Sequence, residues 1–359
     1  MIPHSRPTLG EEEKKACLEV LDSLQIAQGR KVAEFEQALA GLTRRRHAAA
    51  VSSGTAALGL SLCALGVAKG DEVIIPSFTC AALLHALAFA GAKPVLADIE
   101  PEDFNLSAED VKRKIRRRTK AVIVPHLFGR AAEIREFLKL NIPIIEDGTQ
   151  ALGVVAYGKP VGSFGIMSVF SFYATKMITT GEGGMILTDS RALARRILDL
   201  RDYDKKENYR FRTNAKMTDL EAAIGIEQLK KLPRFIANRR DIARFYDEAL
   251  NHSDIILPIA DDIRDHVYFR YVIRICRKAK QRLRDLNRQG IDAKTPVFKP
   301  LHRYLGLEDK LFPETVRAMR ETCSLPIFPS MKEESQETVC RILNEVMSNS
   351  MQSKALCGV

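Results

Sequence analysis

The stretch that decides the fold is AAAVSSGTAALGLSLCALGVAKGDEVIIP, residues 48–76. Its pattern predicts a strand over residues 48–51, a helix over 55–65 and a second strand over 73–76. Continuous apolar strands that alternate with helices are typical of a mostly parallel sheet covered by helices on both faces. Because such sheets bind ligands at the carboxyl ends of their strands, the polar residues that follow each strand are the candidates for a functional site.

The same alternation continues to residue 188. Further strands are expected at residues 94–97, 121–125, 143–146, 169–172 and 185–188. Further helices are expected at residues 79–90, 107–115 and 131–140, and two N-terminal helices at 11–24 and 31–42 precede the first strand. The sequence therefore predicts an α/β protein whose large domain, with the N-terminal helices, spans residues 1–249.

The C-terminal third has a different pattern, which predicts a smaller α+β domain over residues 250–347. Two helices, broken near Pro233, are expected at residues 217–232 and 234–250 because proline removes a helical hydrogen bond. Beyond them, the pattern favours a strand at 268–276 and helices at 277–289 and 333–347. Residues 348–359 are expected to form a flexible tail.

Composition excludes several classes of protein. With 46% hydrophobic and 28% charged residues, the 359-residue chain is an ordinary globular protein, and a disordered chain, a collagen and a coiled coil are excluded. No apolar run is long enough for a membrane span, and the first residues lack a signal-peptide core, so a cytoplasmic protein without a membrane partner is expected. The seven cysteines form no Cys-x-x-Cys pair, which predicts reduced thiols and no metal site.

The net charge of +10 is partly local. Residues 112–120 contain seven basic side chains, and Arg44-Arg45-Arg46-His47 forms a second cluster. A nucleic-acid-binding patch is one interpretation of these runs. No aromatic residues interleave them, so solvated surface is the favoured interpretation and no nucleic-acid partner is expected. A positive field also suits an anionic small substrate.

The turn Ser52-Ser53-Gly54-Thr55-Ala56 lies between the first strand and its helix. Glycine permits the tight turn, and Thr55 opens the helix, so free N–H groups and a hydroxyl face the same point. This arrangement favours an anion, above all a phosphate. Small residues also occur at such turns without any ligand, so the motif alone does not establish a site.

Two further strands end in polar residues. Asp147, in Glu146-Asp147-Gly148-Thr149-Gln150, follows one strand, where its carboxylate either meets a ligand or caps a helix. Lys176 follows another strand and precedes Gly181-Glu182-Gly183-Gly184, which permits close backbone approach to a ligand. A desolvated lysine can form a Schiff base. A phosphate turn, an acid that keeps a pyridine nitrogen protonated and such a lysine are together the parts of a pyridoxal 5'-phosphate site.

These motifs resemble those of the DegT/DnrJ/StrS family of sugar aminotransferases. Other matching stretches are Ser5-Arg6-Pro7, Gln28-Gly29, Gly70-Asp71-Glu72-Val73-Ile74-Ile75-Pro76-Ser77, Pro300-Leu301-His302 and Leu325-Pro326. The resemblance covers residues 2–347. It implies the fold of type I pyridoxal-phosphate-dependent transferases, with a large domain built on a mostly parallel sheet and a smaller α+β domain at the C-terminus.

The resemblance also implies roles for individual residues. Lys176 would carry the cofactor covalently and move the substrate proton, Asp147 would pair with the pyridinium, and Gln150 would bond the phenolic oxygen. The phosphate would be held by Gly54, Thr55, Ala56 and Ser171. Asn214 would reach the phosphate of the partner subunit, which implies a homodimer with shared active sites. His302 would lie on the substrate side, although a loop histidine without such a role is an equally good interpretation.

Three departures from the family pattern bear on the site. Cys80 occupies a position that is often aromatic and stacks on the cofactor ring. Gly148-Thr149 replaces a pair of alanines, and Asn214-Ala215-Lys216-Met217 replaces the commoner Asn-Tyr-Arg-Met. These changes put ring stacking and the role of a family arginine in doubt, but they leave the lysine and the acid in place.

The function implied is transfer of an amino group, from L-glutamate, to a nucleotide-diphosphate-linked 3- or 4-keto sugar in amino-sugar and polysaccharide biosynthesis. One alternative is an aminotransferase that acts on a cyclitol or another small ketone. A second is a cofactor-dependent sugar dehydratase, but those relatives place histidine at the position of Lys176. A third, a regulatory nucleic-acid-binding protein, would show steeply salt-dependent binding and no cofactor absorbance.

Overall fold

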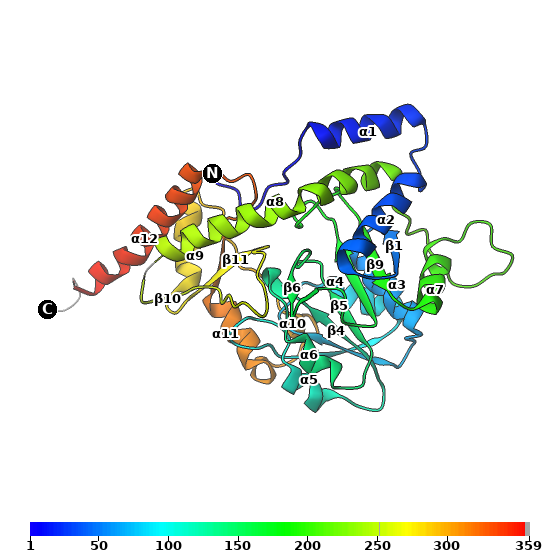
Figure 1. The fold of residues 1–359 in the computed structure, drawn as a ribbon. Coiled ribbons are helices and arrows are strands. Elements are labelled where there is room, and N and C mark those ends of the chain that lie inside the picture. Colours follow the sequence, from blue (N-terminus) through cyan, green and yellow to red (C-terminus); the bar gives the residue numbers. More distant parts are fainter. Residues whose placement is uncertain (251, 356–359) are drawn as a thin grey trace.

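A central sheet of seven strands forms the large part of the molecule (Figure 1). The computed structural model describes residues 1–250 and 252–355, with side chains to residue 348. In spatial order the strands are β1 (His47–Val51), β9 (Gly184–Thr188), β8 (Met167–Ser171), β5 (Ile144–Asp147), β4 (Thr119–Pro125), β2 (Glu72–Pro76) and β3 (Lys93–Ala97). Only β9 runs antiparallel to its neighbours, so the predicted mostly parallel sheet is confirmed.

Helices cover both faces of this sheet. One face carries α3 (Gly54–Leu65), α4 (Ala82–Ala90) and α7 (Arg191–Arg201). The other carries α2 (Arg30–Thr43), α5 (Ala108–Lys114), α6 (Ile134–Leu138) and the first half of α8 (Asp219–Ala249). Successive strand residues alternate between the two cores, as Ile75 and Ile74 do. The strands are therefore apolar on both sides, which explains their uninterrupted runs in the sequence.

Helix α8 continues through Pro233, so the predicted break there is wrong. Its first half packs Ala222 and Leu232 against the large-domain core, and its second half packs Ile242 and Tyr246 into the small-domain core. Burial along both halves outweighs the cost of about 3 kcal/mol for an interior proline. The helix therefore links the two parts of the molecule (Figure 1).

The start of α8 also fixes the start of α2. Asp219, which is buried, accepts hydrogen bonds from the N–H groups of Gly29, Lys31 and Val32 at 2.8, 3.1 and 2.9 Å. These are orphan donors at the beginning of α2, and a carboxylate there also meets the positive end of the helix dipole. A side chain about 190 positions away in the sequence thus supplies the cap that Gly29 cannot provide.

The small domain is built on a three-stranded antiparallel sheet of β10 (Ile255–Ile256), β11 (Tyr271–Ile275) and β12 (Thr322–Leu325). Helices α9 (Ala279–Arg288), α11 (Pro313–Glu321) and α12 (Glu333–Ala355) pack around it. The N-terminus also lies here, since Ile2 pairs with Ile291. Helix α12 extends past residue 347 to Ala355, and residues 356–359 of the expected tail lie outside the described residues.

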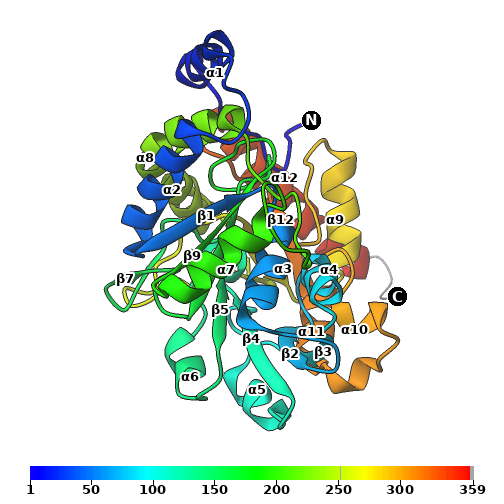
Figure 2. The same cartoon turned by 90° about the vertical axis from the view of Figure 1, so that its right-hand side faces the viewer.

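The remaining elements are peripheral. Helix α1 (Glu11–Ser23) rests on α8 and projects from the body (Figure 2), and β6 (Val155–Ala156) and β7 (Lys159–Pro160) form a small ribbon. Short helices are η1 (Leu127–Gly129), α10 (Leu301–Tyr304) and η2 (Asp309–Leu311). None of the helices in the described part of the chain is long and apolar enough to cross a membrane.

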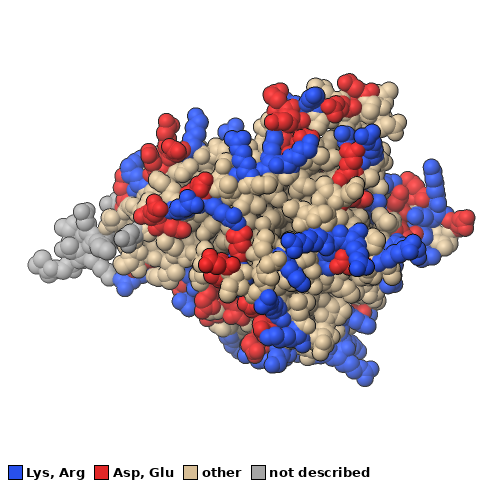
Figure 3. Space-filling model, viewed as in Figure 1, with Lys and Arg blue, Asp and Glu red and all other residues tan. Residues whose placement is uncertain are grey.

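Acidic and basic side chains are interspersed over the face in Figure 3. In the basic run of residues 112–120, Lys114 bonds Asp110 at 2.7 Å and the carbonyl of Leu96 at 2.8 Å, and Arg113 also bonds Asp110. Part of this run is therefore paired within the protein. The structure supports the interpretation of the run as an ordinary helix end and turn.

Candidate active site

The carboxyl ends of β5 and β8 bring the candidate acid and the candidate lysine together. The two strands are parallel neighbours, with Asp147 opposite Val169 in the register. Ser171 ends β8, and the chain then turns through residues 172–176 to Lys176. Residues separated by some thirty positions therefore meet at one edge of the sheet, as expected for a ligand site in an α/β fold.

The candidate phosphate cup lies at the start of α3. The Oγ atom of Ser53 accepts the N–H of Ala56 at 3.1 Å, which leaves the N–H groups of Gly54 and Thr55 without a partner within the helix. Gly54 lies so close to β8 that a Cβ atom on it would be 2.7 Å from the Cβ atom of Ser171. Two N–H groups and two hydroxyls thus gather at this helix terminus, while the expected N–H of Ala56 is already used by Ser53.

The neighbouring carboxylates of Glu146 and Asp147 have different environments. Asp147 is buried, and its Oδ1 atom accepts the N–H of Thr149 at 3.0 Å. No hydrogen bond from the described residues reaches its Oδ2 atom, and no cation forms an ion pair with the carboxylate. A buried carboxylate with one oxygen unpaired is suited to accept a proton-bearing ring nitrogen.

Glu146 has a structural environment instead. Its side chain is fully buried and accepts the N–H groups of Gly162, Phe164 and Gly165 at 2.7–2.8 Å, with the His126 ring at 3.3 Å. Burial acts to raise the pKa of Glu146, but these hydrogen bonds more than offset it, so the pKa lies below its ordinary value. Glu146 therefore stabilises the loop after β7.

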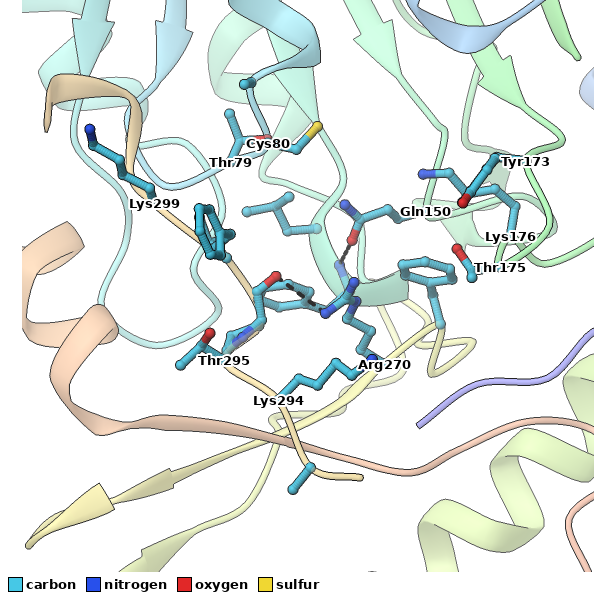
Figure 4. A pocket seen from close by; sticks show the side chains of 18 of the residues that line it. Thr79, Cys80, Gln150, Tyr173, Thr175, Lys176, Arg270, Lys294, Thr295 and Lys299 are labelled. Atoms are coloured by element: carbon cyan, nitrogen blue, oxygen red, sulfur yellow. Dashed lines mark hydrogen bonds between the residues drawn. The ribbon is translucent and has the colours of Figure 1, made fainter. Parts of the chain in front are cut away.

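Lys176 lines a cavity of about 690 Å³ between the large and small domains. Figure 4 shows its amine directed toward the space beside Gln150. Burial lowers the pKa of Lys176, while the nearby Cys80 and Asp147 act to raise it. A lysine whose pKa is lowered has a larger fraction of neutral, nucleophilic amine.

Gln150 and Cys80 line the same cavity. The Oε1 atom of Gln150 accepts the N–H of Phe128 at 2.9 Å, so its amide nitrogen remains free to donate into the cavity (Figure 4). Cys80 is exposed at the cavity wall, where its small thiol cannot offer the flat surface of an aromatic ring.

A local steric restriction explains why residue 148 is glycine and not alanine. A Cβ atom on it would lie 2.5 Å from Cε1 and 2.8 Å from Cζ of Phe170. The ring of Phe170 therefore fills the space that an alanine methyl group would occupy. This departure from the family pattern belongs to the packing behind Asp147.

Only three of the predicted site residues, Lys176, Gln150 and Cys80, line the cavity. Those outside its lining are Gly54, Thr55, Ala56, Asp147, Ser171, Asn214 and His302. Asn214 is exposed at the end of the loop between α7 and α8, which extends away from the body at the right of Figure 1. His302 is fully buried, with Nδ1 2.6 Å from Ser77 Oγ, Nε2 3.0 Å from Asp309 and its ring stacked on Phe312. In this chain, His302 joins the end of β2 to the small domain and has no surface in the cavity.

Sequence reasoning missed one wall of the cavity. Beyond the predicted residues, the lining includes Thr79, Tyr173, Thr175, Phe269, Arg270, Lys294, Thr295, Phe298, Lys299 and Tyr304. Most of these belong to the small domain. The small-domain residues form no motif and follow no strand of the large sheet, so the sequence contains no signal that places them in the same cavity as Lys176.

The residues present fit pyridoxal 5'-phosphate. The start of α3 offers unpaired N–H groups to a phosphate, Asp147 offers an unpaired carboxylate oxygen to a ring nitrogen, and Lys176 offers an amine with a lowered pKa. No group of three or more potential metal ligands occurs within the described residues.

Comparisons with known proteins identify the family of the chain. The family model of the DegT/DnrJ/EryC1/StrS aminotransferase family matches residues 7–344. GDP-perosamine synthase of Escherichia coli O157:H7 is 32% identical over 97% of this chain and 99% of its own. The aminotransferase TlmJ of Streptoalloteichus hindustanus superposes with a TM-score of 0.93 at 30% identity, covering 98% of this chain and all of the other.

A sugar aminotransferase described as putative, Spr1654 of Streptococcus pneumoniae, has been solved in its PMP-form and its PLP-form. The PMP-form superposes with a TM-score of 0.90 at 25% identity over 97% of this chain and all of its own. The family model, the relatives and the solved structures agree over nearly the whole chain, and the chain belongs to the DegT/DnrJ/EryC1/StrS family of pyridoxal-phosphate-dependent aminotransferases.

Proposed function

We propose that this enzyme transfers an amino group from L-glutamate to a keto sugar linked to a nucleoside diphosphate, at carbon 3 or 4 of the sugar. The observation that carries the proposal is the position of Lys176, with a lowered pKa, in a large cavity lined by further cations. The name of the GDP-perosamine synthases, which are similar over nearly the whole chain, supports a nucleotide-linked substrate.

The cofactor supplies an electron sink that stabilises negative charge at the substrate carbon next to the nitrogen. The proposal assigns this chain's residues to three tasks. Lys176 would hold the cofactor covalently and would carry the proton to and from that carbon. Asp147 keeps the ring nitrogen protonated, and Gln150 donates to the phenolic oxygen. Gly54, Thr55 and Ser171 would hold the phosphate, and Cys80 would lie near the ring.

The cavity supports an anionic acceptor. Its volume of about 690 Å³ is within the usual range for small-molecule sites. At the end away from Lys176, Lys299 lies over the ring of Tyr304 at 4.5 Å, and Figure 4 shows its amine far from the reacting end. A cation there suits a diphosphate while the sugar reaches Lys176.

We further propose a homodimer in which Asn214 reaches the phosphate bound by the partner subunit. The residue is exposed at the base of a loop that leaves the body (Figure 1) and has no role in the cavity of its own chain. The loop also exposes Tyr209 and Phe211, and aromatic residues are enriched at protein interfaces. His302 has no substrate contact in this proposal.

A two-stage absorbance experiment tests the function. Holoenzyme is first mixed with L-glutamate, which should convert the bound cofactor to its amine form and release 2-oxoglutarate. The amine form, freed of glutamate, is then offered nucleotide-linked 3-keto and 4-keto sugars and, in parallel, a cyclitol ketone, and the true acceptor should restore the original absorbance. If only a cyclitol ketone restores it, the acceptor assignment is wrong, and if glutamate causes no change, the donor assignment is wrong.

A further inference from the structure

Arg270 places a positive charge in the cavity without a protein counter-ion. The residue comes directly before β11, and its Nη1 atom donates to the carbonyl of Pro296 at 3.2 Å. Within the described residues its guanidinium forms no ion pair, and burial lowers its pKa. By contrast, Lys294 in the same cavity pairs with Asp292 at 3.3 Å. An unpaired arginine in a cavity wall is costly unless a ligand supplies the missing anion.

The charge of Arg270 lies close to the reacting end of the cavity. The guanidinium carbon is 5.7 Å from the centre of the Phe269 ring, and the amine of Lys176 is 5.3 Å from the same centre. Figure 4 shows the guanidinium directed toward Gln150. The cup at the start of α3 does not border this part of the cavity. The group that Arg270 faces is therefore the substrate and not the cofactor phosphate.

The backbone around Arg270 is held firmly. Its N–H donates to the carbonyl of Phe128, and the N–H of Phe128 donates to the side chain of Gln150. Phe128 therefore fixes the position of Arg270 relative to Gln150. The fully buried Arg239 donates to the carbonyls of Tyr268 and Phe269 at 3.1 and 3.3 Å. A guanidinium fixed in this way loses little conformational freedom when a ligand binds.

We infer that Arg270 binds a carboxylate of one of the two substrates and makes the enzyme selective for it. A guanidinium offers two parallel N–H groups, which match the two oxygens of a carboxylate, and the single bond to Pro296 leaves most of its donors free. The carboxylate belongs either to the amino donor or to the ring of an acidic keto sugar. The inference rests on the proposed aminotransferase function.

The test compares Arg270→Gln, which removes the charge, with Arg270→Lys, which keeps the charge but not the fork. Lys299→Gln is the matched control, because it removes a charge from the other end of the same cavity. Calorimetry on holoenzyme measures the affinity for glutarate, which represents the donor, and for glucuronate, which represents an acidic sugar. Glucose is the uncharged reference for glucuronate. Circular dichroism and cofactor absorbance establish that each variant is folded and loaded.

Loss of one charge-assisted, two-point contact should weaken binding about 10- to 100-fold. We expect Arg270→Gln to lose this factor for glutarate if the donor is recognised, or for glucuronate but not glucose if the acceptor is. Arg270→Lys should lose less, and Lys299→Gln should change the affinity for each carboxylate by less than Arg270→Gln does. If Arg270→Gln does not fold, Arg270→Lys becomes the test. It should bind the same carboxylate more weakly than wild type, by a smaller factor, and unchanged binding overturns the inference.

The inference and the proposed function fail in different ways. If wild-type holoenzyme responds to L-glutamate but Arg270→Gln binds both carboxylates as tightly as wild type, only the inference is overturned. If wild-type holoenzyme neither responds to L-glutamate nor binds either carboxylate, both are overturned. The inference alone is overturned if Lys299→Gln loses as much affinity as Arg270→Gln, because a general positive field would then explain the binding.

Discussion

The substitution Gly148→Ala should destabilise the protein, although it adds only one methyl group and the family pattern has alanine at this position. The new Cβ atom would lie 2.5, 2.8 and 3.1 Å from three carbons of the Phe170 ring, whereas carbon atoms in contact prefer about 3.5–4.0 Å. The ring must therefore move by about 1 Å. Phe170 is 1% exposed and also faces Gly162, where a Cβ atom would be 2.8 Å from its Cζ atom, so the ring has no free space.

Overpacking of this kind costs about 1–3 kcal/mol, and we expect Gly148→Ala to lower the free energy of unfolding by that amount. The variant Phe170→Leu removes the clashing carbons and costs about 1–2 kcal/mol by itself, because it leaves a cavity. The double variant should lose less stability than the sum of the two single losses, by at least about 1 kcal/mol, because the leucine no longer clashes with the alanine.

Urea unfolding of the cofactor-free protein, followed by circular dichroism, measures these differences as shifts of the midpoint at constant slope. Gly41→Ala is the matched control, because Gly41 lies inside α2 with nothing within 4 Å of the new methyl group. That control should gain about 0.5–1 kcal/mol from helix propensity. If Gly148→Ala unfolds at the wild-type midpoint, or if Phe170→Leu fails to compensate, the steric explanation of Gly148 is wrong.

Four further outcomes are expected. Borohydride reduction of the holoenzyme should label Lys176, and because burial lowers the pKa of this lysine, covalent cofactor uptake by the apoenzyme should rise with pH and level off below the ordinary lysine pKa; a label elsewhere refutes the assignment. Asp147→Asn should retain the cofactor but lose roughly 100-fold or more in turnover, and near-normal turnover would leave Asp147 as a turn residue only. Asp219→Ala should lose about 2–4 kcal/mol in urea unfolding, because three charge-assisted bonds that cap α2 disappear, and an unchanged midpoint would contradict this. Mixed dimers of Lys176→Ala and Asn214→Asp should regain part of the activity if Asn214 acts on the partner subunit, whereas heterodimers confirmed by mass but inactive would show that it does not.

The sequence by itself determined the strands of the large sheet and the order of the cofactor motifs. Both depend on short stretches: a strand buried on two faces needs a continuous apolar run, and a phosphate turn needs its small residues next to one another. The position of Asp147 and Lys176 at one edge of the sheet could be predicted for the same reason. Each follows a strand of one parallel sheet, and the geometry of such a sheet brings the carboxyl ends of its strands together.

Only the tertiary structure decided the features that depend on residues far apart in the chain. Helix α8 continues through Pro233 because one half is buried in the large-domain core and the other in the small-domain core. Local helix propensity contains no information about this burial. His302 is held against Ser77 and Phe312, away from the cavity, by the docking of the small domain on the large one. The same docking brings Arg270 into the cavity that Lys176 lines, with both side chains near the ring of Phe269. The position of the Arg270 charge in the cavity is therefore set by packing between domains, because no local pattern of residues requires an arginine there.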